Sequence, residues 1–348
     1  MTVREVTQKF ANTILSFGRG FTSKPCSDLP GIVHRPRRAL LYVPGNDERK
    51  IRKAATELSV DVVCMDCEDA VAASQKNTAR NCVVQQLETL TFGESERAVR
   101  INSLGSGLAD ADLEAVLSSD TLPDALVIPK VCTSVDLRTI VPKVKKILRH
   151  NSDKLEKRDN PLKLITMCES AMGLLNLREV LDSAMELGLL GHTGSPLRLE
   201  ACILGGDDFA ASVGAARTRQ SAELLFARQC FLTHCRAYGL QPIDVVQISY
   251  KDDSLLRHEA AEGAQMGFEG KQIIHPAQAG IVQEVFSPSA GAVQSAEELV
   301  AAFEEHQRSG RGAFVFKGQM VDNPTVLQAR NVLARAAACA PRAGAPPS

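Results

Sequence analysis

Short apolar segments recur along this chain, and each is separated from the next by a stretch with the composition of an amphipathic helix. Short apolar runs bounded by loop residues are typical of buried parallel strands, and strands that alternate with helices pair through right-handed crossovers. Eight such units that close on themselves predict a (β/α)8 TIM barrel of roughly 250 residues. No Gly-x-Gly-x-x-Gly motif follows the first segment, which disfavours an open dinucleotide-binding sheet. The predicted strands are Ala39–Val43, Asp61–Asp66, Ala98–Asn102, Ala125–Pro129, Leu162–Cys168, Ala201–Gly205, Ile243–Ser249 and Gln272–His275.

The acids at the ends of the fifth and sixth predicted strands are the strongest candidates for a metal site. Active sites of TIM barrels lie at the carboxyl ends of the strands, and Glu169 and Asp208 stand there on neighbouring strands. Mg2+ is usually held by one or two carboxylates, with substrate and water in the remaining positions. The pattern therefore predicts Mg2+ ligands, with capping of the following helices as the alternative role. Asp207 is expected to point elsewhere and to support Asp208.

Two basic side chains stand at the ends of the third and fourth predicted strands. An arginine inside a barrel strand needs an anionic partner, and the planar fork of Arg100 suits a carboxylate or an enolate oxygen. An ion pair with Glu68 or Asp69 is compatible with that role, because such acids would hold the guanidinium for substrate. Lys130 allows Schiff-base aldolase chemistry, although a structural pair with a nearby acid is the preferred interpretation.

Two further candidates lie outside the strand ends. Arg49 belongs to a basic cluster over Arg49–Lys53 that could bind a phosphate-bearing handle such as coenzyme A. A solvated helix face is the alternative for that cluster. Asp322 lies between a strand-like run and a helix that begins near Pro324. It is interpreted either as a cap of that helix or as a catalytic acid/base delivered over an active site.

The chain is expected to have four parts. Residues 1–27 are basic, rich in hydroxyl side chains and poor in acids, which predicts a cleaved transit peptide for the mitochondrial matrix, with a disordered arm as the alternative. Residues 38–286 form the predicted catalytic barrel. Residues 287–340 are predicted to form a helical and β-hairpin extension that acts as a lid or subunit contact. Residues 341–348 are small and rich in proline, and a disordered tail is expected.

Charge and composition exclude several classes of protein. A formal net charge of −1 offers no basic field for nucleic acid, and no apolar run approaches the roughly 20 residues of a membrane span. Ten cysteines are scattered without a regular framework, and the pair Cys64 and Cys67 has no second pair at zinc spacing. Reduced core thiols in a reducing compartment are therefore expected.

Taken in their order along the chain, the motifs that contain the candidate residues resemble those of the HpcH/HpaI aldolase, citrate lyase beta-subunit and malyl-CoA lyase family. The resemblance runs from about Arg38 to Ala338, and its strength comes from the ordered set of motifs. One departure is Asp207, where the family commonly has glutamate beside the metal aspartate. The matching pieces are Leu41–Asn46, Asp66–Val71, Val99–Asn102, Ile128–Lys130, Glu169–Gly173, Gly205–Phe209, Gly270–Pro276 and Met320–Asp322.

The resemblance implies a homotrimer of barrels in which the C-terminal segment of one subunit covers the site of a neighbour. It places Mg2+ on Glu169 and Asp208, and it makes Asp322 the catalytic acid/base. It assigns acyl-CoA or carboxylate contacts to Tyr42, Arg49 and Arg100, with backbone contacts near Ile273 and Ile274.

The implied reaction is Mg2+-dependent retro-Claisen cleavage of (3S)-citramalyl-CoA to acetyl-CoA and pyruvate, in which Arg100 stabilises the enolate. Side activities as malate synthase, β-methylmalate synthase and malyl-CoA thioesterase are expected. The expected partners are acyl-CoA thioesters and small 2-oxo acids, rather than nucleic acid or membrane. Two other functions remain open, a Schiff-base 2-oxo acid aldolase at Lys130 and a non-catalytic acyl-CoA-binding protein.

Overall fold

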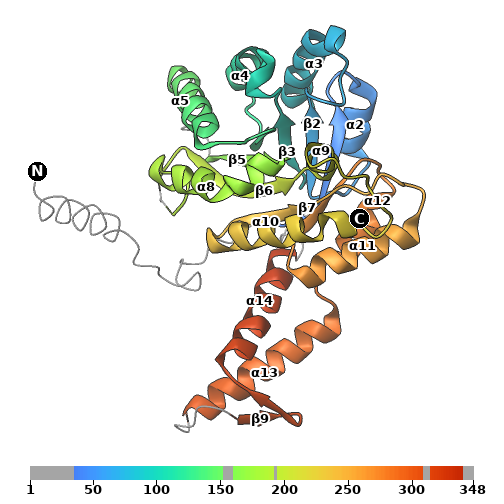
Figure 1. Cartoon of the computed structure of the whole chain (residues 1–348), viewed down its shortest axis with the longest axis vertical. Coiled ribbons are helices and arrows are strands. Elements are labelled where there is room, and N and C mark those ends of the chain that lie inside the picture. The colour runs from blue at the N-terminus through green and yellow to red at the C-terminus, as the bar shows by residue number, and fades with distance from the viewer. Residues whose placement is uncertain (1–34, 152–159, 192–193, 309–313, 340–348) are drawn as a thin grey trace, which may run out of the picture. The chain divides into compact units, whose positions relative to one another are not determined.

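Eight parallel strands close into a barrel in chain order, with β1 paired to both β2 and β8. Helices follow the strands and surround them (Figure 1), which confirms the predicted (β/α)8 fold. The strands are β1 (Ala39–Pro44), β2 (Val62–Asp66), β3 (Glu96–Arg100), β4 (Ala125–Ile128), β5 (Leu162–Cys168), β6 (Leu197–Leu204), β7 (Gln241–Asp244) and β8 (Gly270–Ile273). The helices around them are α2 (Glu48–Thr56), α3 (Lys76–Thr89), α4 (Ala109–Ser118), α5 (Ser134–His150), α7 (Ala171–Leu175), α8 (Leu177–Glu186), α9 (Gly206–Ser212), α10 (Leu225–Ala237), α11 (Asp253–Met266) and α12 (Gln278–Phe286).

The computed structural model describes residues 35–151, 160–191, 194–308 and 314–339. These residues belong to the second of two units into which the chain divides, after residue 32. The transit peptide predicted over residues 1–27 and the tail predicted over residues 341–348 lie outside the described residues. None of the described helices is long and apolar enough to cross a bilayer.

Apolar residues occupy both faces of strands such as β1 and β2 because both faces of the sheet are buried. Successive side chains of a strand point to opposite faces. Leu40 and Val62 therefore fill the barrel interior, whereas Leu41 and Val63 pack outward in a larger cluster with the helices. This double burial explains why the sequence shows continuous apolar runs rather than an alternating pattern. Cys64 is one of the buried free thiols, as expected for a core cysteine.

The seventh strand ends earlier than predicted. The prediction of a strand to Ser249 is wrong, because β7 ends at Asp244 and its ladder with β8 ends at the pair of Asp244 with Lys271. The next residues have no neighbouring strand to pair with, although they continue an apolar run. Ser249 consequently lies in the loop between β7 and α11.

A buried ionic cluster closes the amino-terminal mouth of the barrel. Arg37 is inaccessible to solvent and donates from Nε and Nη2 to both oxygens of Glu96, at 2.6 and 2.8 Å. It also donates to Glu200 at 2.8 Å and to Gln241. Burial alone would raise the pKa of Glu96, but Arg37 and Lys163 outweigh it and lower that pKa to about 2. These acids interrupt the apolar pattern, which is why the predicted third and sixth strands begin too late.

Replacing Arg37 with methionine is expected to destabilise the barrel strongly. The change leaves Glu96 and Glu200 buried without their main counter-charge, and breaking a buried ion pair in this way typically costs about 3–5 kcal/mol. The measurement is the free energy of unfolding in urea. The control is Arg257→Met, which removes an exposed pair with Glu284 and should leave the unfolding midpoint unchanged. Equal midpoints for both variants would contradict the structural role of Arg37.

After the barrel, the chain forms two paired helices joined by a hairpin. These elements are α13 (Ala290–Arg308), β9 (Phe314–Phe316), β10 (Gln319–Val321) and α14 (Asn323–Cys339). β9 and β10 pair antiparallel, and Phe303, Val321 and Val326 form a small separate core. Arg335 of α14 donates to the carbonyl of Phe286 on α12 at 2.8 Å, so the later part of α14 is fastened to the barrel. The hairpin lies at the opposite end of this helix pair (Figure 1).

Candidate active site

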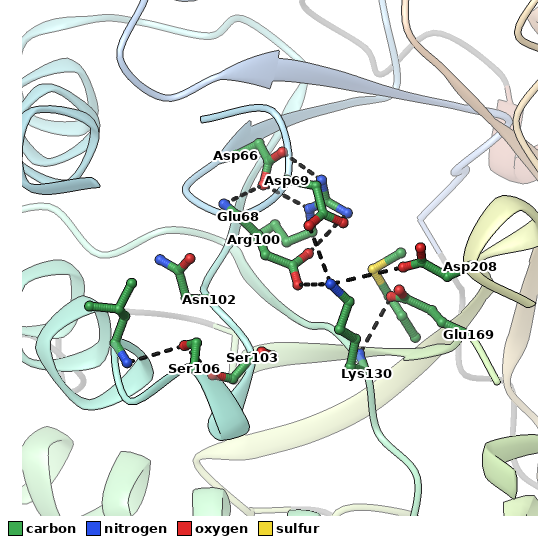
Figure 2. Close-up of polar contacts among 12 residues, drawn as sticks. Asp66, Glu68, Asp69, Arg100, Asn102, Ser103, Ser106, Lys130, Glu169 and Asp208 are labelled. Carbon is green, nitrogen blue, oxygen red and sulfur yellow. Dashed lines mark hydrogen bonds and ion pairs between the residues drawn. The ribbon is translucent and has the colours of Figure 1, made fainter. Parts of the chain in front are cut away.

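Glu169 and Asp208 come together at the carboxyl mouth of the barrel (Figure 2). Glu169 directly follows β5, and Asp208 lies in the first turn of α9 after β6. Burial, a hydrogen bond to Asp208 and the negative charges of Glu68 and Asp208 raise the pKa of Glu169 to about 9. Capping does not explain Glu169, because the hydroxyl of Ser170 accepts the Gly173 amide at the start of α7. Two carboxyl groups held this close repel each other when both are ionised, so a bound cation would stabilise their charged forms.

The pair fits a hard divalent cation. It offers carboxylate oxygens, which Mg2+ prefers, and it leaves coordination positions for substrate and water. No group of three His, Cys, Asp or Glu residues able to hold a metal occurs among the described residues, and two carboxylates together with substrate and water are sufficient ligands for Mg2+. The side chain of Asp207, which was expected to support Asp208, pairs with Arg217.

Gly205 makes room for the buried carboxylate. A Cβ atom at this position would lie 2.5 Å from Cγ of Glu169 and 3.0 Å from its Cδ. Such contacts do not occur between real atoms, so either Glu169 or the chain between β6 and α9 would have to move. Close packing against Glu169 therefore explains why the first residue of the Gly-Gly-Asp-Asp sequence is glycine.

Gly205→Ala is expected to weaken Mg2+ binding by on the order of 10-fold while the barrel still folds, since displacing a binding group by a fraction of an ångström is costly. Isothermal titration calorimetry with Mg2+ measures the change in affinity. Gly280→Ala serves as the control, because a Cβ there meets nothing within 4 Å. Unchanged affinity in Gly205→Ala would show that Glu169 is not held where the cation binds.

Arg100 is fixed by an acid that sequence reasoning missed. It donates from Nε to Oδ1 of Asp66 at 2.7 Å and from Nη2 to Oδ2 at 2.5 Å. Its third nitrogen, Nη1, lies 3.3 Å from Glu68, which confirms one of the two predicted partners. The other predicted partner, Asp69, contacts Lys130 instead. Asp66 is the last residue of the second apolar run, and Glu169 directly follows the fifth. The pattern that singled out Glu169, an acid at the end of an apolar run, could therefore have identified Asp66 as well.

The ring of Tyr42 supports the face of the same guanidinium. Cζ of Arg100 lies 4.6 Å from the centroid of the Tyr42 ring, a distance typical of a cation–π contact. Tyr42 is the fourth residue of β1 and packs on the apolar interior of the barrel. Arg100 is thus held by a carboxylate along its edge and by a ring on its face, and its charge is directed to the mouth.

Lys130 bridges the two halves of the site. Its Nζ lies 3.0 Å from Glu68, 3.2 Å from Asp69 and 3.9 Å from Asp208. Burial alone would lower the pKa of Lys130, but the bonds and charges of Glu68 and Asp69 outweigh it and raise that pKa. A protonated lysine cannot form an imine, so this arrangement favours the structural pair over Schiff-base chemistry. The residue has φ of +54°, and its amide faces Glu169 at 3.4 Å.

The proposed coenzyme A contacts lie around the same mouth. Arg49 is exposed on α2, which follows β1. Ile273 ends β8 as a buried residue, whereas Ile274 is 44% exposed. The amide of Ile274 already donates to the side chain of Gln278 at 3.0 Å, so a substrate would meet its side chain and carbonyl rather than a free N–H.

Asp322 does not join these residues within its own chain. It is exposed and caps α14, accepting from the amide and hydroxyl of Thr325 at 3.1 and 2.8 Å. These bonds lower its pKa, and the predicted capping role is confirmed. The part of α14 that contacts the barrel is at Arg335, roughly 20 Å along the helix from its start.

The chain is similar to known proteins over most of its length. The family model for HpcH/HpaI aldolase/citrate lyase matches residues 38–276. Mitochondrial citramalyl-CoA lyase of Homo sapiens is 46% identical over 298 residues, covering 86% of this chain and 85% of that protein. A (3S)-malyl-CoA thioesterase of Cereibacter sphaeroides is 35% identical over 305 residues, covering 88% of this chain and 96% of that protein. The solved structure of CitE from Mycobacterium tuberculosis, in complex with magnesium, acetoacetate and coenzyme A, has a TM-score of 0.64 at 27% identity and covers 87% of this chain and 98% of its own.

Proposed function

Because this chain belongs to the HpcH/HpaI aldolase/citrate lyase family, we propose that it is a magnesium-dependent lyase that cleaves (3S)-citramalyl-CoA to acetyl-CoA and pyruvate. The observation that carries this proposal is the meeting of Glu169, Asp208 and Arg100 at one mouth of the barrel. A relative named for this activity shares 46% identity, and a related solved structure contains magnesium and coenzyme A. Malate synthase, β-methylmalate synthase and malyl-CoA thioesterase activities are proposed as side reactions of the same site.

The charged residues of the site suit a reaction that develops an enolate. Glu169 and Asp208 would hold Mg2+, which when bound supplies Lewis-acid polarisation of the hydroxy-acid oxygens. As the hydroxyl loses its proton, the carbon–carbon bond breaks and its electron pair moves into the thioester. Arg100 then stabilises the thioester oxygen electrostatically, at a position preset by Asp66 and Tyr42. As the acid/base, Asp322 accepts the hydroxyl proton and returns it to the terminal carbon of the enolate, which completes acetyl-CoA.

In this proposal the assembly is a homotrimer, and Asp322 of one chain reaches the barrel mouth of a neighbouring chain. Two apolar surfaces support the docking. At the barrel mouth, Leu175 and Phe226 are 77% and 76% exposed. On the hairpin that precedes Asp322, Met320 is 77% exposed. Apolar surfaces of this kind mark contact sites between proteins, and contact between these two would bring the carboxylate of Asp322 over the Mg2+ site.

The compartment proposed is the mitochondrial matrix. The relative from Homo sapiens is described as mitochondrial, and residues 1–27 have the composition of a transit peptide. The reducing environment of that compartment agrees with the free, buried state of Cys64 and Cys67.

A substrate panel with metal controls tests the proposal. The full chain is incubated with citramalyl-CoA and malyl-CoA, and acetyl-CoA and the 2-oxo acid are measured with Mg2+ and with EDTA. Turnover that requires Mg2+ is expected. Turnover that survives EDTA, together with borohydride trapping at Lys130, would establish the aldolase alternative. Binding of acyl-CoA without turnover of any thioester would establish a non-catalytic binding protein.

A further inference from the structure

A buried glutamine lies directly beneath the proposed site, and no role has been assigned to it. Gln272 belongs to β8 and is 4% exposed. It pairs in register with Leu40, whose side chain fills the barrel interior, so the side chain of Gln272 also points inward. Its position places a polar amide at the top of an otherwise apolar interior, where every hydrogen-bonding group needs a partner.

All the polar atoms of the Gln272 amide are used. Nε2 donates to the carbonyl of Leu204 and to the carbonyl of Asp244, both at 2.9 Å. These are the last residues of β6 and β7, and the ladder between the two strands ends one residue earlier, at Ile203 and Ile243. Gln272 therefore replaces the missing ladder bonds and ties β8 to both strands.

The two carbonyls also determine which way the amide faces. A carbonyl oxygen can only accept, so the nitrogen of Gln272 must point to Leu204 and Asp244. Oε1 is then directed at the hydroxyl of Tyr42, which donates to it at 3.2 Å. The other neighbour of that hydroxyl is the sulfur of Met167 at 3.8 Å, a weak acceptor. Gln272 is thus the main polar group that orients the Tyr42 ring.

The orientation of Tyr42 matters because its ring carries the guanidinium of Arg100, 4.6 Å from the centroid. Asp66 bonds to one edge of that guanidinium, and Glu68 lies 3.3 Å from its Nη1, so both acids act on the edges of the group. The Tyr42 ring supports its face and so limits its tilt. Gln272, Tyr42 and Arg100 form a continuous series of contacts from the barrel interior to the site.

We propose that Gln272 is a positioning residue for the enolate-stabilising Arg100 and that it acts through Tyr42. This inference rests on the proposed lyase function. Gln272 touches no substrate; it sets the tilt of the Tyr42 ring, and the ring sets the guanidinium where charge develops on the thioester oxygen. Removing the amide should therefore affect the chemical step rather than the binding of thioester or metal.

A double-mutant cycle tests this on the full chain. The variants are Gln272→Met, which keeps the side-chain volume, Tyr42→Phe, which keeps the ring and removes the hydroxyl, and the double variant. In Gln272→Met, kcat for citramalyl-CoA should fall by about 10- to 100-fold, as for a small misplacement of a catalytic group. KM and the Mg2+ affinity from calorimetry should stay within about twofold. The double variant should be no slower than the slower single variant, because both changes break one series of contacts.

Two further measurements separate positioning from general weakening of the barrel. Exchange of the acetyl-CoA methyl protons with D2O reports enolate formation, and it should slow in parallel with kcat. Gln241→Met is the matched control, because Gln241 is also a buried strand glutamine, but it contacts Arg37 and the carbonyl of Arg35 at the opposite mouth. That variant should lower the unfolding midpoint and leave kcat unchanged.

The possible outcomes distinguish the inference from the function on which it rests. Absence of wild-type turnover with every thioester overturns both. Wild-type turnover with unchanged kcat in Gln272→Met, or with additive losses in the cycle, overturns the role of Gln272 alone. If Gln272→Met does not fold, the Tyr42→Phe variant tests the inference in its place. An unchanged kcat in Tyr42→Phe would show that the hydrogen bond from Gln272 to Tyr42 does not position Arg100.

Discussion

Turnover of Asp322→Asn is expected to be about 10²- to 10⁴-fold lower than that of the wild-type protein, the usual contribution of a positioned acid or base. Folding should be unaffected, because asparagine caps a helix as well as aspartate does and can still accept from the amide of Thr325. Mg2+ affinity should be unchanged, since Asp322 is remote from Glu169 and Asp208 in its own chain. Steady-state kinetics measures the turnover, and calorimetry measures the Mg2+ affinity.

Thr325→Ala is the matched control for the capping role of Asp322. It removes the hydroxyl bonded to Asp322 at 2.8 Å but leaves the carboxylate in place, so most of the activity should remain. Full activity in Asp322→Asn would eliminate Asp322 from the mechanism. Equal losses in both variants would mean that the conformation of the segment, and not its carboxylate, is what matters.

Co-expression with a second variant tests whether Asp322 acts on a neighbouring subunit. Chains carrying Asp322→Asn keep an intact metal site, and chains carrying Glu169→Gln keep an intact Asp322. If each site uses the barrel of one chain and the hairpin of another, random mixing in a cyclic trimer should restore about one quarter of the sites. If each site is completed within one chain, the mixture should stay inactive.

The second large effect is expected for Glu169→Gln, which should abolish lyase activity through loss of the metal. Loss of even a supporting partner of a metal ligand typically costs about 10- to 100-fold in affinity, so loss of the ligand itself should weaken Mg2+ binding by more than about 100-fold. The fold should not suffer, because the wild-type carboxyl is buried against other acids that raise its pKa to about 9. Calorimetry with Mg2+ and urea unfolding measure these effects.

Asp207→Asn is the control for that experiment. Asp207 directly precedes Asp208 in the chain, but its side chain pairs with Arg217. The variant removes a carboxylate next to Asp208 without changing a proposed metal ligand, so its Mg2+ affinity should match that of the wild type. An equal loss of affinity in Asp207→Asn and Glu169→Gln would mean that only the overall negative charge attracts the metal, and the ligand assignment would fail.

Local sequence patterns were sufficient to single out Glu169 and Asp208 but not to predict the contacts among the residues at the strand ends. Glu169 and Asp208 stand out because each follows a short apolar run, and parallel strands bring such positions to one face. The partner of Arg100 was not decided in this way, since Asp66, Glu68 and Asp69 all lie within four residues at the end of the second strand. The structure selects Asp66 as the bidentate partner and gives Glu68 to both Arg100 and Lys130.

Other residues of the site carry no signal in the sequence. Gln272 is one of two polar residues in the four-residue strand β8, and only the positions of Leu204 and Asp244 show that its amide joins three strands and supports Tyr42. Gly205 precedes an acidic pair in a glycine-rich turn, and only the side chain of Glu169 shows why a Cβ is excluded there. Asp322 caps α14, as its position before the helix predicts, yet its distance from the barrel mouth depends on how α14 is fastened at Arg335.

By itself, the sequence determined the barrel and the face on which its chemistry lies, because both depend on the order and spacing of apolar runs and on the residues that end them. Only the tertiary structure decided which acid holds Arg100, which residue orients Tyr42 and where Asp322 stands. These are contacts between residues far apart in the chain, and their energies depend on distances and burial that exist only after the barrel has closed.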